Sequence, residues 1–273
     1  MIIDGKKLSN GIQNLLREEI LKSGLLVRLA VIQVGNDPVT EKFLEQKKKF
    51  GADIGVAVDI CNFPKATSTD EIIKKISEVA RQADVGGIIV QLPLPSNINT
   101  NEVLDTIPFN KDPDTLSSKS TELLASGSRN ILPPVVGAVR HIMETYHIAL
   151  SGKQAVVIGR GRLVGLPVAL WLTGQGATVT TLDKYTEHVQ DFTLSADIIV
   201  SGAGKGGLIT SDMVHEGTVV IDCGSSELYG HIVGDVEKTV AEKAAFFSPV
   251  PGGVGPLTVA MLFSNVLALV KKS

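Results

Sequence analysis

Hydrophobic and polar positions in the first half of the chain follow two different periods. Apolar-rich runs predict strands at residues 27–34, 56–63 and 86–92, the last of them fully apolar. Apolar residues spaced three and four positions apart predict helices, at residues 8–21, about 39–53 and 69–81. Because helices and strands alternate in this order, the pattern predicts a mainly parallel sheet with crossover helices.

The second half of the chain shows the same alternation. Helices are expected at residues 135–146 and 164–174, and buried strands at 154–159, 177–182, 196–202 and 218–224. The stretch 99–132 between the halves has weak periodicity and mixed polarity, so we expect it to be irregular. The sequence therefore predicts an α/β protein of two α/β domains, residues 1–132 and 133–256.

The run PVPGGVGPLTVAML, residues 249–262, combines a stiff first half with an apolar second half. Three prolines and three glycines within eight residues exclude a helix or strand interior. A helix of about 257–269 follows, with Thr258 as its expected N-cap. This helix is apolar on most sides and must be covered, so we expect residues 257–273 to pack back on the first domain. The run is either an inter-domain connection or a loop whose backbone a flat ligand can approach.

Composition narrows the class of protein. The 273 residues are 44% hydrophobic but only 4% aromatic, which predicts an aliphatic core. A net charge of −3 argues against a nucleic-acid partner, and no apolar run is long enough to span a bilayer. The N-terminus does not resemble a signal peptide, and Cys61 and Cys223 lie far apart in apolar contexts. These features favour a cytoplasmic protein with reduced core thiols, and the scattered histidines predict no metal site.

A glycine-rich turn follows the expected strand at 154–159. Gly159, Gly161 and Gly165 are spaced G-x-G-x-x-x-G and lead into a helix. This arrangement provides a tight turn and a helix N-terminus for a pyrophosphate, as in a Rossmann-type dinucleotide-binding domain. The spacing is one residue longer than the usual pattern, and the alternative is a glycine-rich turn without a ligand.

The residues after the next strand bear on the choice between NAD and NADP. Asp183 lies 24 residues after Gly159, where an acid accepts hydrogen bonds from the adenosine ribose and repels a 2′-phosphate. That position favours NAD. Arg160 and Lys184 act in the opposite direction, because either can pair with a phosphate.

A lysine lies on an apolar helix face within the basic run 47–49. Phe43, Lys47, Phe50 and Ile54 follow helical spacing and share one face, from which the other two lysines point away. A lysine buried among apolar side chains titrates nearer neutrality and can act as a general base or proton donor. The alternative is that its stem is buried and its ammonium reaches water.

Three further polar residues are candidates for a site. Gln91 ends an apolar strand, where side chains of parallel sheets face a ligand crevice, and it is either a partner of Lys47 or a polar strand cap. Asp112 and Asp114 lie in the segment NKDPDTL, where they fix a polar ligand edge or form an Asx-turn.

Five motifs occur in an order that resembles the methylenetetrahydrofolate dehydrogenase/cyclohydrolase family. The resemblance covers nearly the whole chain. VQLPLP and PGGVGP are its most specific parts. The motifs are T-x-x-F-x-x-x-K-x-K at 40–49, VQLPLP at 90–95, KDPD at 111–114, GRGRLVGLP at 159–167 and PVPGGVGPLTVAML at 249–262.

The resemblance implies a folate-binding catalytic domain, a Rossmann-type NAD(P)-binding domain and a homodimer. It implies oxidation of 5,10-methylenetetrahydrofolate to the methenyl form, followed by hydrolysis to 10-formyltetrahydrofolate. The implied catalytic residues are Lys47, Gln91 and Asp114. The implied substrate-binding residues are Phe43, Leu92, Asp114, Pro251, Gly252 and Gly253, with Pro256 in the same loop. The expected cofactor-binding residues are Gly159, Arg160, Gly161, Gly165, Asp183, Lys184, Gly255 and Thr258.

The chain departs from the family pattern at several positions. The usual serine and tyrosine of the lysine motif are Thr40 and Phe43, and a phenylalanine has no hydroxyl to bond Lys47. This change favours the dehydrogenase over the cyclohydrolase. The usual glycine after the folate aspartate is Thr115. Gly161 and Asp183-Lys184 replace a serine and a His-Ser pair, which favours NAD over the family's habit of NADP. The alternatives are a dehydrogenase without cyclohydrolase activity and a catalytically silent folate or nucleotide binder.

Overall fold

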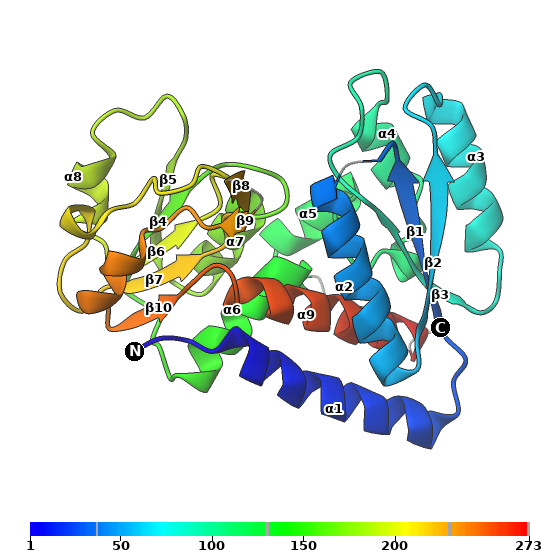
Figure 1. The fold of residues 1–273 in the computed structure, drawn as a ribbon, viewed down its shortest axis with the longest axis horizontal. Coiled ribbons are helices and arrows are strands. Elements are labelled where there is room, and N and C mark those ends of the chain that lie inside the picture. Colours follow the sequence, from blue (N-terminus) through cyan, green and yellow to red (C-terminus); the bar gives the residue numbers. More distant parts are fainter. Residues whose placement is uncertain (37, 129–130, 229–230, 272–273) are drawn as a thin grey trace. The chain divides into compact units, whose positions relative to one another are not determined.

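The structure is a computed structural model that describes residues 1–36, 38–128, 131–228 and 231–271. The chain divides into two compact units, each built on a parallel sheet (Figure 1). The three-stranded unit comprises Asn10–Leu123, Arg129–Pro134 and Val259–Ser273. The five-stranded unit comprises Met1–Ser9, Leu124–Ser128 and Val135–Thr258.

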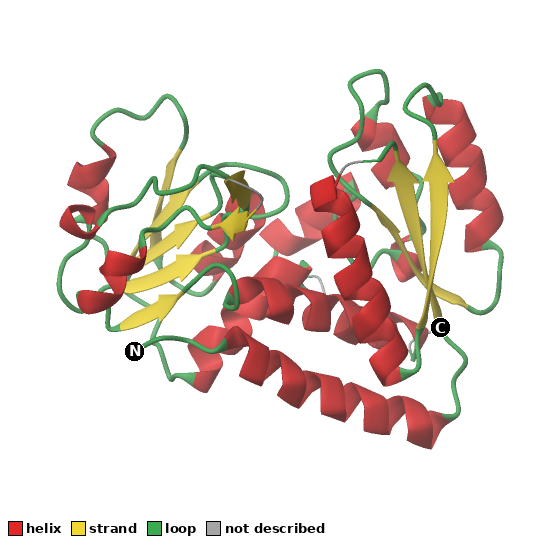
Figure 2. Ribbon diagram, viewed as in Figure 1, coloured by secondary structure: helices red, strands yellow, loops and turns green. Residues whose placement is uncertain are grey.

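The sheet of the three-stranded unit has the order β2-β1-β3, and both strand pairs are parallel (Figure 2). The bounds are Arg28–Val34 for β1, Ala57–Phe63 for β2 and Val85–Val90 for β3. The parallel sheet predicted from the alternation is confirmed. The main helices of this unit are α2 (Pro38–Ile54), α3 (Thr69–Ala80) and α4 (Thr100–Asp105), together with the larger parts of α1 (Gly5–Ser23), from Asn10 on, and of α9 (Val254–Val270), from Val259 on.

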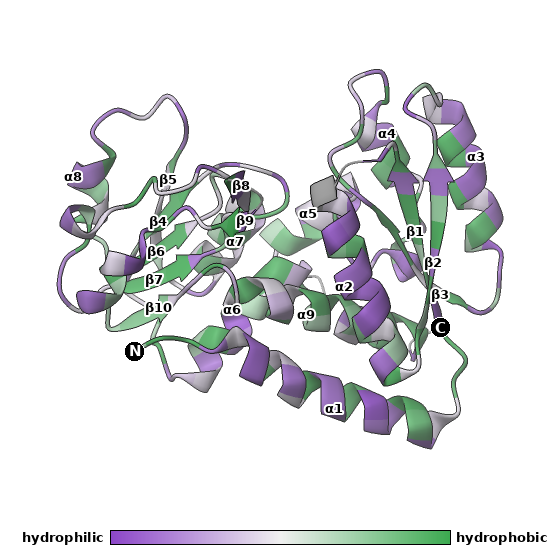
Figure 3. Ribbon diagram, viewed as in Figure 1, coloured by the Kyte–Doolittle hydropathy of each residue, from purple (hydrophilic) through white to green (hydrophobic). Residues whose placement is uncertain are grey.

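Alternate side chains of β1 belong to two hydrophobic clusters. Leu29 and Val31 pack with residues of α1, α2 and α9, whereas Ala30 and Ile32 pack with residues of α3 and α4. Successive side chains of a strand point to opposite faces, so a strand covered on both faces is apolar at every position. This double burial explains the apolar run inside β1, and the inner strands of the second sheet, β4, β6 and β7, are likewise coloured as hydrophobic in Figure 3.

The five-stranded unit contains a second parallel sheet, with the order β10-β7-β6-β4-β5. The three inner strands β4, β6 and β7 are buried along nearly their whole length. The bounds are Gln154–Ile158 for β4, Thr178–Leu182 for β5, Ile198–Ser201 for β6, Val219–Asp222 for β7 and Phe246–Ser248 for β10. Its helices are α6 (Pro134–Thr145), α7 (Gly165–Gly174) and α8 (Val189–Thr193), and β8 (Ser226–Leu228) pairs with β9 (His231–Val233) in an antiparallel ribbon.

Two expectations about local structure are wrong. The stretch 99–132 is not irregular throughout, because it contains α4 and α5 (Ser118–Ala125). Asn99 caps α4 by accepting a hydrogen bond from the backbone N–H of Glu102. A helix of six or eight residues has too few turns to show a periodic stripe, so local capping rather than periodicity marks such a helix.

Thr258 is not the N-cap of the last helix, since α9 begins four residues earlier, at Val254. The Thr258 hydroxyl donates to the backbone oxygen of Val254 at 3.0 Å, as expected inside a helix. Pro256 does not prevent this early start, because the N–H groups of a first helical turn have no intrahelical partner to lose.

Candidate functional site

The helical face that carries Lys47 exists as predicted. Phe43 and Lys47 are partly buried, Phe50 and Ile54 are in the core, and the neighbouring Lys48 and Lys49 are exposed. Phe50 stacks on Phe263 of α9, with ring centroids 5.2 Å apart. The spacing in the sequence therefore separates one enclosed lysine from two solvated ones.

Lys47 and Gln91 meet at the carboxyl end of the three-stranded sheet. The Lys47 ammonium donates a hydrogen bond to Gln91 Oε1 at 3.1 Å. Gln91 directly follows β3, and its backbone N–H donates to the oxygen of Ile32 on β1 at 2.8 Å. Its side-chain amide also donates to the backbone oxygen of Leu92 at 3.3 Å. The sheet thus fixes the backbone that presents the glutamine to the lysine.

Asp114 is the third member of this group, and burial shapes its proton affinity. Burial lowers the pKa of Lys47. The nearby Asp114 carboxylate attracts the ammonium and opposes this shift, but its effect is the smaller of the two. Burial also raises the pKa of Asp114 to about 6. The positive charge of Lys47 lowers this pKa, and the negative charge of Asp112 raises it further. Both charged forms are therefore disfavoured. A lysine of lowered pKa beside a carboxyl of raised pKa is suited to acid–base chemistry.

The two aspartates of the KDPD segment have different surroundings. Asp112 is buried and accepts hydrogen bonds from the backbone N–H of Thr115 at 2.8 Å and the hydroxyls of Ser117 and Ser120 at 3.1 and 2.7 Å. It holds the turn that follows. Asp114 lies within electrostatic reach of Lys47. The Asx-turn and the ligand-facing acid were alternatives for this segment, and the geometry supports one role for each aspartate.

Thr115 adopts a backbone conformation that favours glycine. Its φ is 57°, in the left-handed region, and a β-branched residue is strained there. Its hydroxyl oxygen is buried and has no hydrogen-bond partner among the described residues. The glycine that the resemblance implies after the aspartate would adopt this backbone conformation without strain.

Thr115→Gly is expected to raise the free energy of unfolding by about 1 kcal/mol, because it relieves left-handed strain and removes a buried hydroxyl. Denaturant unfolding measures the change. Thr115→Ala is the matched control, since it removes the hydroxyl but keeps a side chain at positive φ. A glycine variant no more stable than the alanine variant would show that the backbone is not strained.

The glycine-rich turn of the five-stranded unit has two glycines that packing requires. Gly159 has a φ of 98°, and a Cβ there would lie 2.5 Å from the oxygen of Gly202. A Cβ at Gly165 would lie 1.9 Å from the oxygen of Gly159. At Gly161, in contrast, a Cβ would meet nothing within 4 Å. The open space at Gly161, just before α7, fits the close approach of a phosphate group.

Arg160 and Asp183 pair with each other in this unit. Their charged atoms lie 3.3 Å apart, and Asp183 also accepts a hydrogen bond from the backbone N–H of Tyr185 at 3.0 Å. That backbone bond, followed by the bond to Arg160, lowers the pKa of Asp183. The Lys184 ammonium lies 4.9 Å from the centre of the Tyr185 ring. The groups expected to favour NAD and NADP therefore form one cluster.

The proline–glycine loop also lies in the five-stranded unit. Gly252 has a φ of 101°, and a Cβ on Gly253 would lie 2.2 Å from the hydroxyl oxygen of Ser248. The backbone of the loop therefore packs closely against the end of β10, where a side chain on Gly253 would not fit. Pro251 and Gly255 are exposed on either side of this turn.

A pair of buried aspartates in the five-stranded unit was not identified from the sequence. Asp222 ends β7, and Asp235 accepts hydrogen bonds from the hydroxyl of Ser201 and the backbone N–H groups of Ala203 and Lys205. Burial raises the pKa of Asp222 to about 6. For Asp222 the available signal was an acid at the end of an apolar strand, similar to the position of Asp183 directly after β5.

The sequence predicts neither a metal site nor a membrane-spanning segment. Within residues 1–36, 38–128, 131–228 and 231–271, no three histidine, cysteine or acidic side chains gather as a metal site would require. Over the same residues, no helix is both long and apolar enough to cross a membrane. Cys61 and Cys223 are free thiols, and both are partly rather than fully buried.

Comparison with known proteins places both halves of the chain in one family. Residues 3–114 match the model of the tetrahydrofolate dehydrogenase/cyclohydrolase catalytic domain, and residues 133–273 match that of its NAD(P)-binding domain. The bifunctional protein FolD 2 of Lactobacillus johnsonii is 38% identical over 275 residues, covering 99% of this chain and 98% of that protein.

Two solved structures are similar over the full length of the chain. The bifunctional enzyme FolD of Campylobacter jejuni has a TM-score of 0.95 and 37% identity, covering 100% of this chain and 99% of that one. The Trypanosoma brucei enzyme, complexed with NADP and an inhibitor, has a TM-score of 0.95 and 32% identity, covering 100% of this chain and 97% of that one. The chain therefore belongs to the tetrahydrofolate dehydrogenase/cyclohydrolase family.

Proposed function

We propose that the protein oxidises 5,10-methylenetetrahydrofolate to the 5,10-methenyl cation and hydrolyses that cation to 10-formyltetrahydrofolate. Family membership supports both activities. The observation that carries the assignment of residues is the group of Lys47, Gln91 and Asp114, which combines a hydrogen-bonded lysine with a carboxyl of raised pKa. Residues 1–132 and 257–273 would hold the folate, and residues 133–256 the dinucleotide.

A nicotinamide dinucleotide supplies the hydride acceptor of the first reaction. The chain's own task is positioning, since a hydride moves only when the folate carbon lies against the nicotinamide ring. Gly159, Gly161 and Gly165 would admit the pyrophosphate beside the start of α7. Pro251, Gly252, Gly253 and Gly255, with Thr258, would border the nicotinamide and the folate.

The hydrolytic reaction adds water to the cationic carbon and then breaks a carbon–nitrogen bond of the ring. The water loses two protons as it becomes the formyl oxygen: the departing nitrogen gains one, and the other is released to solvent together with the positive charge of the cation. Lys47, with its lowered pKa, can take up a proton from the water and return it to the nitrogen at Nζ, while Gln91 holds the ammonium at 3.1 Å. Phe43 and Leu92 would contact the folate, and Asp114 would bind its polar edge.

A spectroscopic assay tests the whole proposal. Purified protein with methylenetetrahydrofolate and NAD or NADP is expected to form reduced cofactor and methenyltetrahydrofolate, which then decays to the formyl product faster than in buffer. Absence of turnover with both cofactors would overturn the proposal. Folate binding in a calorimeter without turnover would instead support a silent binding protein.

Phe43 supports a second candidate, a dehydrogenase without cyclohydrolase activity. It occupies the same helical face as Lys47 but carries no hydroxyl. Accumulation of the methenyl product, decaying only at the uncatalysed rate, would identify this alternative.

For the cofactor, we propose NAD rather than NADP. The carboxylate of Asp183 is ionised at neutral pH, because its pKa is lowered, and it would repel a 2′-phosphate. Arg160 is engaged with that carboxylate at 3.3 Å, which reduces its availability to a phosphate.

Asp183→Ser is expected to raise kcat/KM with NADP by about 10- to 100-fold and to lower it with NAD, because the substitution removes the repelling charge and releases Arg160. Steady-state kinetics with both cofactors measure the switch. Asp191→Ser removes an exposed acid from α8 in the same unit and should leave the ratio unchanged. An unaltered ratio in Asp183→Ser would show that Asp183 does not select the cofactor.

The cellular compartment and the oligomeric state of the protein are also proposed. We place it in the cytoplasm, supported by the free thiols of Cys61 and Cys223, and we propose a homodimer. Light scattering coupled to size-exclusion chromatography gives the mass directly, and the mass of a single chain would contradict the dimer.

A further inference from the structure

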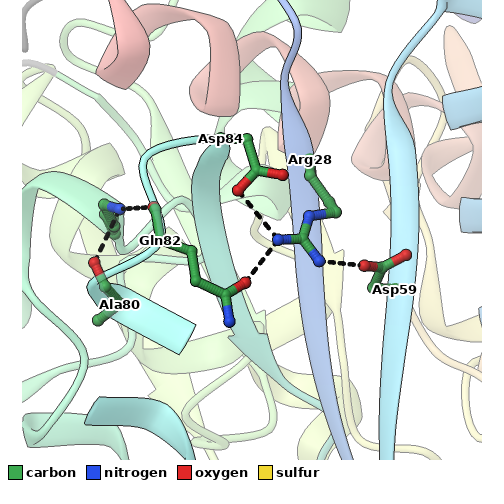
Figure 4. A network of polar contacts seen from close by, with 6 residues as sticks. Arg28, Asp59, Ala80, Gln82 and Asp84 are labelled. Atoms are coloured by element: carbon green, nitrogen blue, oxygen red, sulfur yellow. Dashed lines mark hydrogen bonds and ion pairs between the residues drawn. The ribbon is translucent and has the colours of Figure 1, made fainter. Parts of the chain in front are cut away.

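The segment that carries Asp114 is anchored immediately before and after that residue. The Lys111 ammonium donates to the backbone oxygens of Ala80 and Gln82, both at 2.9 Å, at the end of α3. Figure 4 shows these two carbonyl groups beside the network in which Arg28 joins Asp59, Gln82 and Asp84. Asp112 in turn holds Thr115, on the other side of Asp114.

Pro113 is held by a residue far away in the sequence. The Asn265 amide nitrogen on α9 donates to the backbone oxygen of Pro113 at 2.9 Å and to that of Leu132 at 2.8 Å. The Pro113 ring also packs close to β3, since a Cβ added to Gly87 would lie 3.0 Å from its Cγ. The residue before Asp114 is thus enclosed between a strand and the C-terminal helix.

We propose that Asn265 is a positioning residue for Asp114. Its amide fixes the carbonyl of the peptide bond that joins Pro113 to Asp114, and so sets the direction of the Asp114 carboxyl relative to Lys47. This inference rests on the proposed function, because it assumes that Asp114 serves the folate site.

The choice of asparagine follows from its hydrogen-bonding groups. One amide nitrogen has two N–H donors, and here each donor faces one carbonyl oxygen. Proline has no N–H, so its carbonyl is the only backbone group through which this residue can be tethered. Without the two donors, the peptide plane between Pro113 and Asp114 can rotate, and the carboxyl turns with it.

Asn265→Asp tests the proposal, because it keeps the shape of the side chain and replaces the donors with an acceptor. The expected result is a rise of about tenfold or more in the KM for methylenetetrahydrofolate, from the loss of two hydrogen bonds. The KM for the dinucleotide should stay within about twofold of the wild-type value. Ser264→Ala, the adjacent position on α9, is the matched control and should change neither constant. Asn265→Ala provides the same comparison should the aspartate variant not fold.

The outcomes separate this inference from the proposed function. Wild-type protein without turnover would overturn the proposed function. Active wild-type protein with an unchanged folate KM in a folded Asn265 variant would overturn only the positioning role. A fall in thermal stability, with equal changes in both KM values, would assign Asn265 to the fold alone and would also overturn it.

Discussion

Lys47→Met is expected to remove the hydrolysis of methenyltetrahydrofolate, lowering its rate by a factor of about 100 to 10,000. Methionine replaces the four-atom apolar stem of lysine but has no nitrogen to carry a proton. Burial lowers the pKa of Lys47, so its ammonium gives up a proton more readily than that of an exposed lysine. The decay of methenyl absorbance in the presence of the variant measures the effect.

Lys48→Met is the matched control for this substitution. Lys48 is the next residue of α2, is exposed and pairs with Glu45 on the surface at 2.9 Å. It should keep wild-type hydrolysis, since its ammonium does not lie on the face of Phe43 and Lys47. Full hydrolysis in a folded Lys47→Met protein would exclude the lysine as the proton carrier.

Asp114→Asn is expected to stabilise the protein at pH 7 by up to about 3 kcal/mol while impairing turnover of folate. The pKa of Asp114 rises from 3.8 to about 6 on folding, even with the attraction of Lys47. Between these values the native state binds more protons than the unfolded state, so wild-type stability falls as pH rises from about 4 to about 6. An asparagine does not ionise and avoids this loss.

Urea unfolding of both proteins between pH 4 and pH 7 measures the difference. The two stabilities should be similar at pH 4 and diverge as the pH rises, with the variant the more stable. Asp84→Asn is a control that should destabilise the protein instead. The hydrogen bond from Arg28 lowers the pKa of the Asp84 carboxyl and favours its ionised form, which the substitution removes. Parallel pH profiles for Asp114→Asn and wild type would contradict a raised pKa at Asp114.

Together these expectations describe a site whose native ionisable groups lower the free energy of unfolding of the protein but are needed for the reaction. Both side chains lose hydration on folding, and their mutual attraction does not fully compensate. Groups of this kind are typical of active sites, where function requires a proton affinity that folding alone would not favour.

Much of the fold could be predicted from the chain because its inner strands are buried on both faces. Continuous apolar runs marked β1, β3, β4, β6 and β7, and helical spacing marked α2 and α3. The strand β10 was missed, since it has only three residues, and the short helices α4 and α5 were missed for the same reason.

The candidate site was predictable where local geometry decides which way a side chain points. Helical periodicity alone separated Lys47 from Lys48 and Lys49, and the end of an apolar strand placed Gln91 at the carboxyl edge of the sheet. The glycines at 159 and 165 were also identified from spacing, because a tight turn between strand and helix leaves no room for a Cβ.

The sequence by itself determined the two α/β halves, the family and the enclosed lysine, because each depends on residues that are close together in the chain. Only the tertiary structure decided which aspartate interacts with Lys47, that Arg160 is paired with Asp183, and that Asn265 holds Pro113 from 152 positions away. These contacts join segments that are far apart in the sequence, so the helical and strand periodicity of neighbouring residues could not predict them. For Asp114 and Asn265 the physical origin is the burial of polar groups, which must find partners wherever the fold brings them, whereas Arg160 and Asp183 pair at the surface.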